Sequence, residues 1–261
     1  MPRLGTIALS ATLAAVFTAA PQSNPGRDGA AAPALFPGGE TLSFRIEWRF
    51  IHAGNARLTM TPSNNSGGAG WSARMHLESA GLVSRLYKID TDYSAELTES
   101  LCMVSSLLTA NEGARRRETS VTFDAARRKA NTVERDLVKN QTARHEIDTG
   151  PCEHDSVAAL FRLRALELQP GHSAEIPVSD GKKAVLARVE AQERETITTD
   201  FGKFNTVRYE AFLFNDVLYR RKGRLFVWLT DDERRLPVQI RIRLPIYVGT
   251  VTLQLEKEGK A

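Results

Sequence analysis

The sequence predicts a mainly β protein: a strongly curved antiparallel sheet or an open β-barrel with one short helix. The first observation is a strict alternation near the C-terminus. There every second residue is apolar: Leu236, Val238, Ile240, Ile242 and Leu244. Because a β-strand points successive side chains to opposite faces, this run has one buried, apolar face and one solvent-exposed, basic face. The second observation is that the same rhythm, punctuated by turn residues, recurs along most of the chain.

The first half of the chain predicts strands joined by short turns. The clearest strand is 42–50, with its apolar face formed by Leu42, Phe44, Ile46, Trp48 and Phe50. A turn is expected at 52–54, and 81–88 is expected to form a short helical turn or a bent strand. Further strands are expected at 56–60, 71–77, 91–99, 101–111, 118–123 and 129–135.

One helix is expected, near the middle of the chain. Asp155 is a good N-cap, the 13 residues 156–168 have helical composition, and Pro170 with Gly171 ends the run. So little helix in a chain of this length predicts a plug or flap on a sheet rather than a separate layer. Strands are then expected at 172–178, 184–192, 195–199, 204–213, 224–229, 236–244 and 250–255.

The N-terminus predicts export. Residues 1–20 have the features of a secretory signal peptide: Arg3, an apolar run, and small residues for cleavage. An uncleaved anchor that tethers the protein is the alternative. Residues 21–39 are rich in Pro, Gly and Ala and predict a flexible leader, and 40–258 predicts a single β-rich domain. We therefore expect a periplasmic or secreted bacterial protein, with no stable membrane span after cleavage.

Composition limits the classes of partner. The chain has 261 residues, 42% hydrophobic and 25% charged, which is typical of a globular protein able to bury a core. Its net charge of +4 is too small to indicate nucleic acid, so no nucleic-acid partner is expected. Basic groups recur at strand ends, for example at 115–117, 127–129 and 220–222. They could contact anionic lipid headgroups, or simply form a solvated face.

Cys102 and Cys152 are the only cysteines, and export would bring both into an oxidising compartment. A disulfide between them is the simplest interpretation. Two buried free thiols are the alternative, and a catalytic thiol has less support because no histidine context marks either cysteine.

Candidate chemistry is weak throughout. His154, Asp155 and Ser156 have the residue types of a hydrolase triad, but sequence neighbours do not face one another in triad geometry, and no G-x-S-x-G motif is present. The acidic run 231–233 has the composition of a hairpin turn. No histidines recur at metal-ligand spacing, and no phosphate-binding loop is present. We therefore assign no catalytic residue, no cofactor and no metal, and we favour binding over catalysis while leaving enzymatic activity open.

An apolar inner face could line a ligand cavity, because barrels of eight or more strands can hold a small apolar ligand. A packed core is the alternative. The candidate cavity residues are Phe44, Trp48, Trp71, Phe212, Phe226 and Trp228.

Several short motifs together resemble a known family. They are Gly39-Glu40-Thr41-Leu42, Ala53-Gly54-Asn55-Ala56, Leu86-Tyr87-Lys88, Asp92-Tyr93, Leu168-Gln169-Pro170-Gly171, Val227-Trp228-Leu229-Thr230-Asp231-Asp232 and Arg235-Leu236-Pro237-Val238. In this combination the chain resembles the bacterial domain of unknown function 3108 family over roughly residues 38–256. The resemblance implies an exported protein with a mostly antiparallel β-fold and long curved sheets. It implies no established activity and no catalytic residues.

Three functional hypotheses follow. The first is a non-enzymatic envelope protein that binds an apolar or lipid-like ligand, or an envelope partner, on the concave sheet face. The second is a structural or assembly factor that acts through protein contacts. The third is a hydrolase of an envelope polymer, which would need clustered Asp, His or Ser side chains in a cleft. The sequence leaves the oligomeric state open.

Overall fold

The computed structural model describes Phe36, 38–65 and 68–261. The predicted signal peptide, and the predicted leader apart from Phe36, Gly38 and Gly39, lie outside the described residues. The strands are β1 (Glu40–Trp48), β2 (Ile51–Asn65), β3 (Gly68–Ser79), β4 (Ile89–Thr98), β5 (Met103–Glu112), β6 (Arg115–Asp124), β7 (Lys129–Asp136), β8 (Gln141–Asp148), β9 (Ser173–Ser179), β10 (Ala184–Thr199), β11 (Gly202–Ala211), β12 (Arg224–Thr230), β13 (Pro237–Arg243) and β14 (Thr250–Gly259). The helices in the described part are α2 (Gly81–Leu86) and α3 (Ser156–Ala165).

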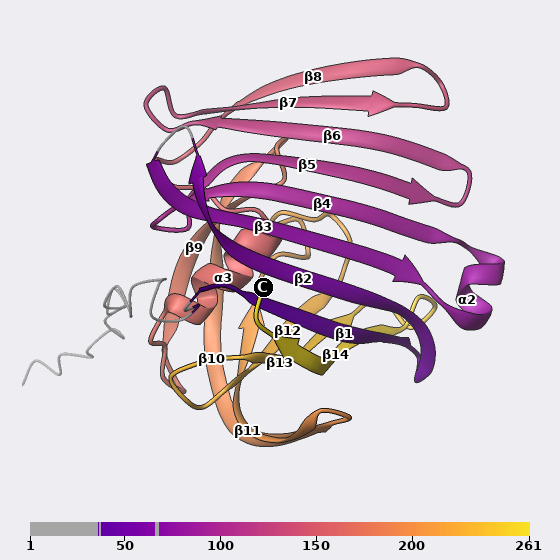
Figure 1. The fold of residues 1–261 in the computed structure, drawn as a ribbon, viewed down its shortest axis with the longest axis vertical. Helices are drawn as coiled ribbons and strands as arrows, with labels where there is room; N and C mark the ends of the chain where they lie inside the picture. Colours follow the sequence, from indigo (N-terminus) through magenta and orange to yellow (C-terminus); the bar gives the residue numbers. More distant parts are fainter. Residues whose placement is uncertain (1–35, 37, 66–67) are drawn as a thin grey trace, which may run out of the picture.

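All of these strands form one sheet, in the order β8-β7-β6-β5-β4-β3-β2-β1-β14-β13-β12-β11-β10-β9. Each neighbouring pair is antiparallel, and every pair except β1–β14 joins strands that are consecutive in the chain. The first and last strands therefore lie side by side in the centre of the sheet (Figure 1). The strands that flank α3 in sequence, β8 and β9, form the two edges, so the sheet is not closed.

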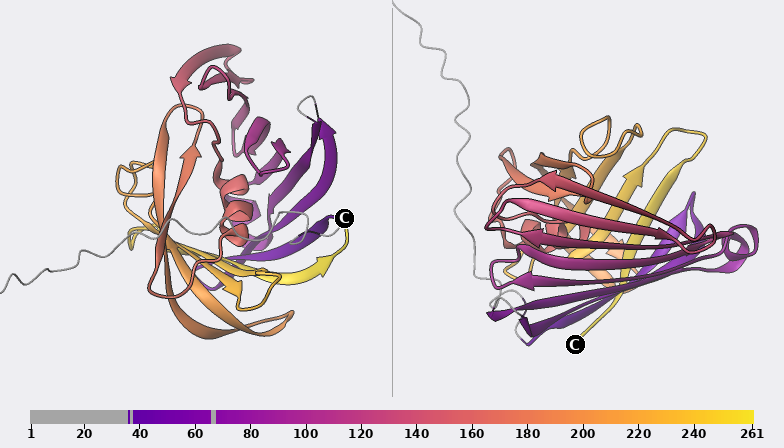
Figure 2. Two further views of the ribbon diagram at one scale, coloured as in Figure 1. Left: turned by 90° about the vertical axis from the view of Figure 1, so that its left-hand side faces the viewer. Right: turned by 90° about the horizontal axis from the view of Figure 1, so that it is seen from above.

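The sheet curves around α3, which lies inside the curve (Figure 2). We call the face that packs with α3 the inner face and the opposite face the outer face. Phe44 and Ile46 of β1 share the inner face with Leu255 and Leu253, their partners on β14. Phe161 of α3 is fully buried in the same cluster. The curve is thus stabilised by burial of one alternating set of apolar side chains around a helix.

The segment before α3 connects the β9 edge of the sheet to strand β5 in the other half of the sheet. The backbone of His154 forms a parallel bridge with Val178 of β9. On the other side, the Met103 N–H at the start of β5 donates to the Glu153 carbonyl at 2.9 Å. The β9–β10 turn also reaches β7, where the Thr132 hydroxyl donates to the Gly181 carbonyl at 2.6 Å.

The predicted fold class is confirmed: the chain is mainly β, in a strongly curved antiparallel sheet. The predicted helix is also present, with the predicted cap. The Asp155 side chain accepts hydrogen bonds from the Val157 and Ala158 N–H groups at 3.0 and 2.9 Å. The helix ends at Ala165 rather than at 168. Leu166 is extended there, and it packs with Leu168 in the second apolar cluster.

The first hairpin differs from its prediction. β1 ends at Trp48, and Phe50 is not on the apolar face but is 96% exposed in the turn. Arg49 and Phe50 both have positive φ, at 50° and 69°, as a tight two-residue hairpin turn requires. The predicted turn at 52–54 is wrong, because these residues already lie in β2 and pair with β1 and β3. Alternation alone did not locate the turn, since neither residue is typical of it.

Two other strands differ. β8 was not predicted, because its side chains are nearly all exposed and polar, which leaves no apolar alternation to detect. β10 is one long strand rather than two, because a bulge between Ala191 and Arg194 shifts the register and interrupts the rhythm. The segment 81–88 forms a short helix over Gly81–Leu86, so the described chain has two helices rather than one.

Candidate functional site

The inner face offers the most extensive apolar surface in the described part of the chain. Close to α3 it is a solid core, in which Phe36 packs edge-to-face on Trp71 and Phe161. Further from the core, apolar side chains are only partly buried. On the sheet these include Trp48, Leu77, Leu108, Val251 and Leu253, and on α3 they include Val157 and Leu160. The inner face therefore combines a packed centre with apolar side chains that retain contact with water.

The six predicted cavity residues do not share one face. Phe44 and Trp71 are buried on the inner face, and Trp48 lies there partly buried. The Trp48 indole N–H donates to the Val248 carbonyl at 2.7 Å, which fixes the ring at the end of β1. These three belong to one inner surface. Whether that surface accepts a ligand stays a prediction.

Phe226 and Trp228 point to the outer face of β12. Val227 pairs with Tyr209 and Ile240 on the inner face, so its neighbours along the strand must point the other way. Both rings are buried, at 4% and 3% exposure. Arginine side chains lie over them, and the Trp228 indole N–H donates to Glu195 Oε1 of β10 at 2.7 Å. The guanidinium carbons of Arg224 and Arg241 are 4.8 and 5.0 Å from the Phe226 and Trp228 ring centroids.

Phe212 follows β11 and is half-buried. It lines a cleft of about 430 Å³ together with Glu190, Gln192 and Glu210. Glu210 is paired with Arg224 at 2.7 Å, and this contact lowers the pKa of its carboxyl group. Phe214 lines the cleft too, so its wall is part polar and part apolar, and none of its lining residues belongs to the inner surface that holds Trp48.

A buried ion pair anchors α3 to β1. Arg164, 1% exposed, donates from Nη1 and Nη2 to the two carboxylate oxygens of Glu40. Nη2 and Nε also donate to the Arg234 and Arg235 carbonyls, at 3.1 and 2.9 Å. The Phe36 ring lies 4.6 Å from the guanidinium carbon. Each nitrogen of this side chain therefore has at least one acceptor, and the buried charge has a partner of opposite sign.

A second polar contact joins the start of α3 to β4. The Tyr93 hydroxyl donates to Asp155 Oδ2, while Asp155 Oδ1 caps the helix. Burial raises the pKa of the Asp155 carboxyl, although its hydrogen bonds oppose the rise. Burial and the Asp155 charge also raise the pKa of Tyr93. His154 and Ser156 point elsewhere: Ser156 Oγ contacts the Tyr219 hydroxyl at 2.8 Å. The three adjacent residues thus serve as a helix start and do not form a triad.

Cys102 and Cys152 form a disulfide, as predicted, with their Cα atoms 4.9 Å apart. The bond joins the start of β5 to the segment that precedes α3. The neighbouring His154 ring is buried, and its Nδ1–H donates to the Pro177 carbonyl at 3.0 Å. Burial lowers the pKa of His154 to about 4. This histidine is therefore neutral at physiological pH.

The acidic run 231–233 behaves as predicted for a turn. Asp232 Oδ1 accepts hydrogen bonds from the backbone N–H groups of Arg234 and Arg235, both at 3.1 Å. Asp231 pairs with Arg194 at 2.7 Å. A cleft of about 450 Å³ opens beside the turn, and Tyr209 lines it too. The carboxylates of Asp231 and Asp232 are therefore already bound to local partners.

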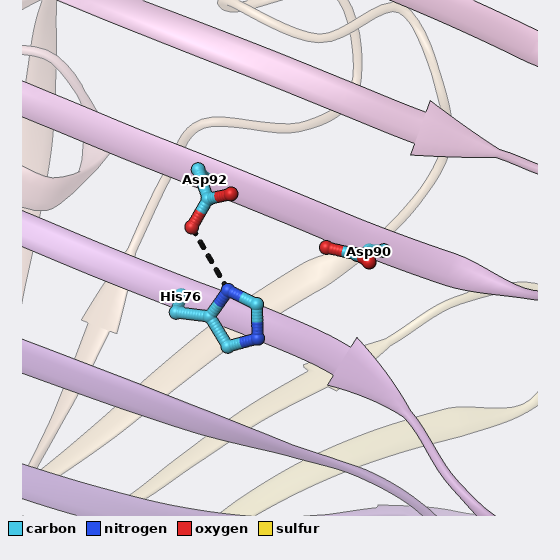
Figure 3. A group of neighbouring side chains, drawn as sticks. All are labelled: His76, Asp90 and Asp92. Carbon is cyan, nitrogen blue, oxygen red and sulfur yellow. Dashed lines mark hydrogen bonds and ion pairs between the residues drawn. The ribbon is translucent and has the colours of Figure 1, made fainter.

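His76, Asp90 and Asp92 converge on the outer face of β3 and β4 (Figure 3). Their ligand atoms lie within 4.8 Å of one another. His76 sits directly opposite Asp92, and its Nδ1 is 2.9 Å from Asp92 Oδ1, a contact that raises the pKa of His76. The group forms across two strands, so spacing along the chain could not reveal it. Because His76 and Asp92 are exposed and already paired, we interpret it as a surface ion pair.

The protein is thus a strongly curved, unclosed antiparallel sheet wrapped around a central helix. A family model described as "Protein of unknown function (DUF3108)" matches residues 43–256. The chain belongs to this family. The match confirms the resemblance found in the sequence, and it brings no activity with it. No curated protein matches the chain.

Solved structures with a similar fold share little sequence. A β-barrel-like protein of the domain of unknown function DUF1849 from Brucella abortus is 9% identical, with a TM-score of 0.53 over 87% of this chain and 99% of that one. A protein from Bacteroides fragilis described as exported is 10% identical, with a TM-score of 0.36 over 90% and 98% of the two chains. The first similarity supports the fold alone, and the second is too weak to support an inference.

None of the helices in the described residues is long and apolar enough to cross a membrane.

Proposed function

We propose that the protein is an exported, non-enzymatic envelope protein that binds an apolar, lipid-like ligand on its inner face. The observation that carries the proposal is the set of partly buried apolar side chains on the inner face outside its packed centre, among them Trp48, Leu108 and Leu253. Ligand sites are typically concave and apolar, with a few polar groups that orient the ligand. The disulfide supports export, because such bonds persist in oxidising compartments.

Catalysis has less support from the same residues. The carboxylates that were candidates for chemistry have other roles: Asp155 caps α3, and Asp231 and Asp232 stabilise a turn. A structural or assembly factor that acts through protein contacts is the second candidate, and no specific contact surface on the inner face favours it over a ligand.

The test is a binding assay with a matched pair of variants. Leu253→Arg places a charge on the inner face, whereas Gln254→Arg places the same charge on the outer face of the same strand. A fluorescent fatty acid is titrated into protein stripped of lipid. We expect Leu253→Arg to weaken binding by about tenfold or more, because burial of an unpaired charge is costly, and Gln254→Arg to have little effect.

Stability is measured on both variants. If Leu253→Arg unfolds, Val251→Thr replaces an inner-face side chain by one of nearly equal size and should weaken binding more moderately. Absence of binding by the parent protein, or an equal loss in Gln254→Arg, would contradict the proposal. Mass spectrometry of organic extracts from natively purified protein should identify the bound molecule.

A further inference from the structure

Exposed apolar side chains gather at one end of the strands. Of the twelve large apolar side chains that are exposed in the described residues, nine lie at the end of the sheet that carries α2. Phe50 is 96% exposed, Ile246 92%, Tyr247 80% and Leu86 75%. We call the following six residues the apolar rim: Phe50, Leu82, Leu86, Tyr87, Ile246 and Tyr247. Figure 1 shows α2 and the β1–β2 turn at this same end, on its right-hand side.

The rim is held together by hydrogen bonds between its turns. The Arg49 guanidinium donates to the Ile246 and Tyr247 carbonyls, both at 2.8 Å, and so joins the β1–β2 turn to the β13–β14 loop. The Tyr87 hydroxyl donates to the Glu112 carbonyl at 3.2 Å, which joins the end of α2 to β5. The exposed side chains therefore project from a connected framework rather than from independent loops.

Large apolar side chains are unfavourable at the exposed positions of the apolar rim. Phe50 occupies a turn position with a φ of +69°, where Gly or Asn would be less strained. A single exposed apolar residue is normal, but a cluster marks an interaction site. Strain and exposure coincide at Phe50, and both favour a role in contact with a partner.

The charge around the rim is positive. Exposed basic side chains lie between or beside its members: Arg49, Arg85, Lys88, Arg115 and Arg116. Within the described part of the chain, none of these five forms an ion pair with a carboxylate within 4.0 Å. Glu112, at the same end, is paired with Arg117 at 3.6 Å. The rim thus combines protruding apolar tips with unneutralised positive charge.

We propose that the apolar rim docks on the surface of a bilayer that contains anionic lipid. Several separate tips can insert between headgroups, whereas a protein partner would favour one continuous patch. Tyrosine and phenylalanine suit the boundary between headgroups and acyl chains, and neighbouring Lys and Arg side chains are attracted to anionic headgroups. This inference does not depend on a ligand at the inner face, since the rim residues project into solvent.

Vesicle co-sedimentation tests the proposal. The mature protein is mixed with vesicles of phosphatidylglycerol and phosphatidylcholine, or of phosphatidylcholine alone. We expect binding to the mixed vesicles, and a loss of about tenfold or more in Phe50→Ser/Ile246→Ser, because two large apolar side chains leave the interface. The matched control is Phe201→Ser, an exposed phenylalanine in the β10–β11 turn at the opposite strand ends, which should bind like the parent.

A second variant tests the charge. Arg85→Glu/Lys88→Glu should weaken binding by about tenfold or more at low salt, and the difference should shrink as salt is added. The substituted side chains contact water, so both double variants should keep the thermal midpoint of the parent.

Three results would overturn the proposal. The first is no binding to the mixed vesicles, and the second is an equal loss in Phe201→Ser. The third is a dimer of the parent protein, detected by light scattering, that Phe50→Ser/Ile246→Ser converts to a monomer. The last result would assign the rim to self-association.

Discussion

His154 links the environment of one side chain to the behaviour of the fold at acid pH. Its ring is 1% exposed and donates to the Pro177 carbonyl, and burial lowers its pKa to about 4. In the unfolded chain a histidine has a pKa of about 6.5. Between these values the unfolded state binds a proton that the folded state does not, so the free energy of unfolding falls as the pH decreases.

The expected loss from His154 is on the order of 3 kcal/mol between pH 7 and pH 4. Urea unfolding of the parent and of His154→Gln at several pH values measures it, because the glutamine cannot take up the proton. The difference in unfolding free energy between the two proteins should shrink as the pH falls. His145→Gln, at an exposed position on β8, is the control and should track the parent. Parallel curves for the parent and His154→Gln would show that this histidine does not cause the acid sensitivity.

At the scale of elements, residue types and spacing predicted most strands and the helix start, but not every end. The alternation of Leu42, Phe44 and Ile46 was sufficient for β1, because one face of that strand is buried along its length. Asp155 was sufficient for the start of α3. The polar strand β8 has no buried face, and its Arg, Glu and Asp side chains suit an unpaired edge. Pattern alone therefore could not find it.

The candidate site was predictable only in part for the same reason. Period-two alternation distinguishes the two faces of one strand. It does not show which face of a distant strand lies on the same side of the sheet. Trp48 and Trp228 both follow the pattern, yet pairing through β14 and β13 places them on opposite faces of the sheet. The rim residues were missed because Phe50, Ile246 and Tyr247 are residue types that usually lie in a core. Their exposure results from the folded turns that carry them.

The Arg164–Glu40 contact is the element-scale prediction. It connects α3 to β1 between residues 124 positions apart in the chain, and both groups are buried. Arg164→Met should lower the free energy of unfolding by about 3–5 kcal/mol, because it leaves the Glu40 carboxylate buried without its partner. Urea unfolding measures the loss. The double variant Arg164→Met/Glu40→Met removes both charges and should recover part of the stability. A loss below about 1 kcal/mol in the single variant would mean that the pair is accessible to water.

At the scale of the whole molecule, the sheet is held in its curve without being closed by hydrogen bonds between its edges. β8 and β9 are the edges, and the segment between them carries both α3 and Cys152. The inner apolar clusters, the Arg164–Glu40 pair and the disulfide all tie that central segment to strands on both sides. The helix thus acts as the plug that the sequence predicted. The Cys102–Cys152 disulfide fixes the segment before the helix to the start of β5.

The disulfide should therefore contribute to the stability of the whole fold rather than of one hairpin. Cys102→Ala/Cys152→Ala removes a cross-link between residues 50 positions apart, and should lower the free energy of unfolding by about 4 kcal/mol on the chain-entropy model. Urea unfolding with and without a reductant measures this. Reductant should destabilise the parent by a similar amount and leave the double variant unchanged, which separates loss of the bond from loss of the side chains. The transition is followed by two independent probes, tryptophan fluorescence and circular dichroism. If both report one coincident transition in the variant, the bond supports one cooperative unit; two separated transitions would show that it stabilises only the β5 side of the sheet.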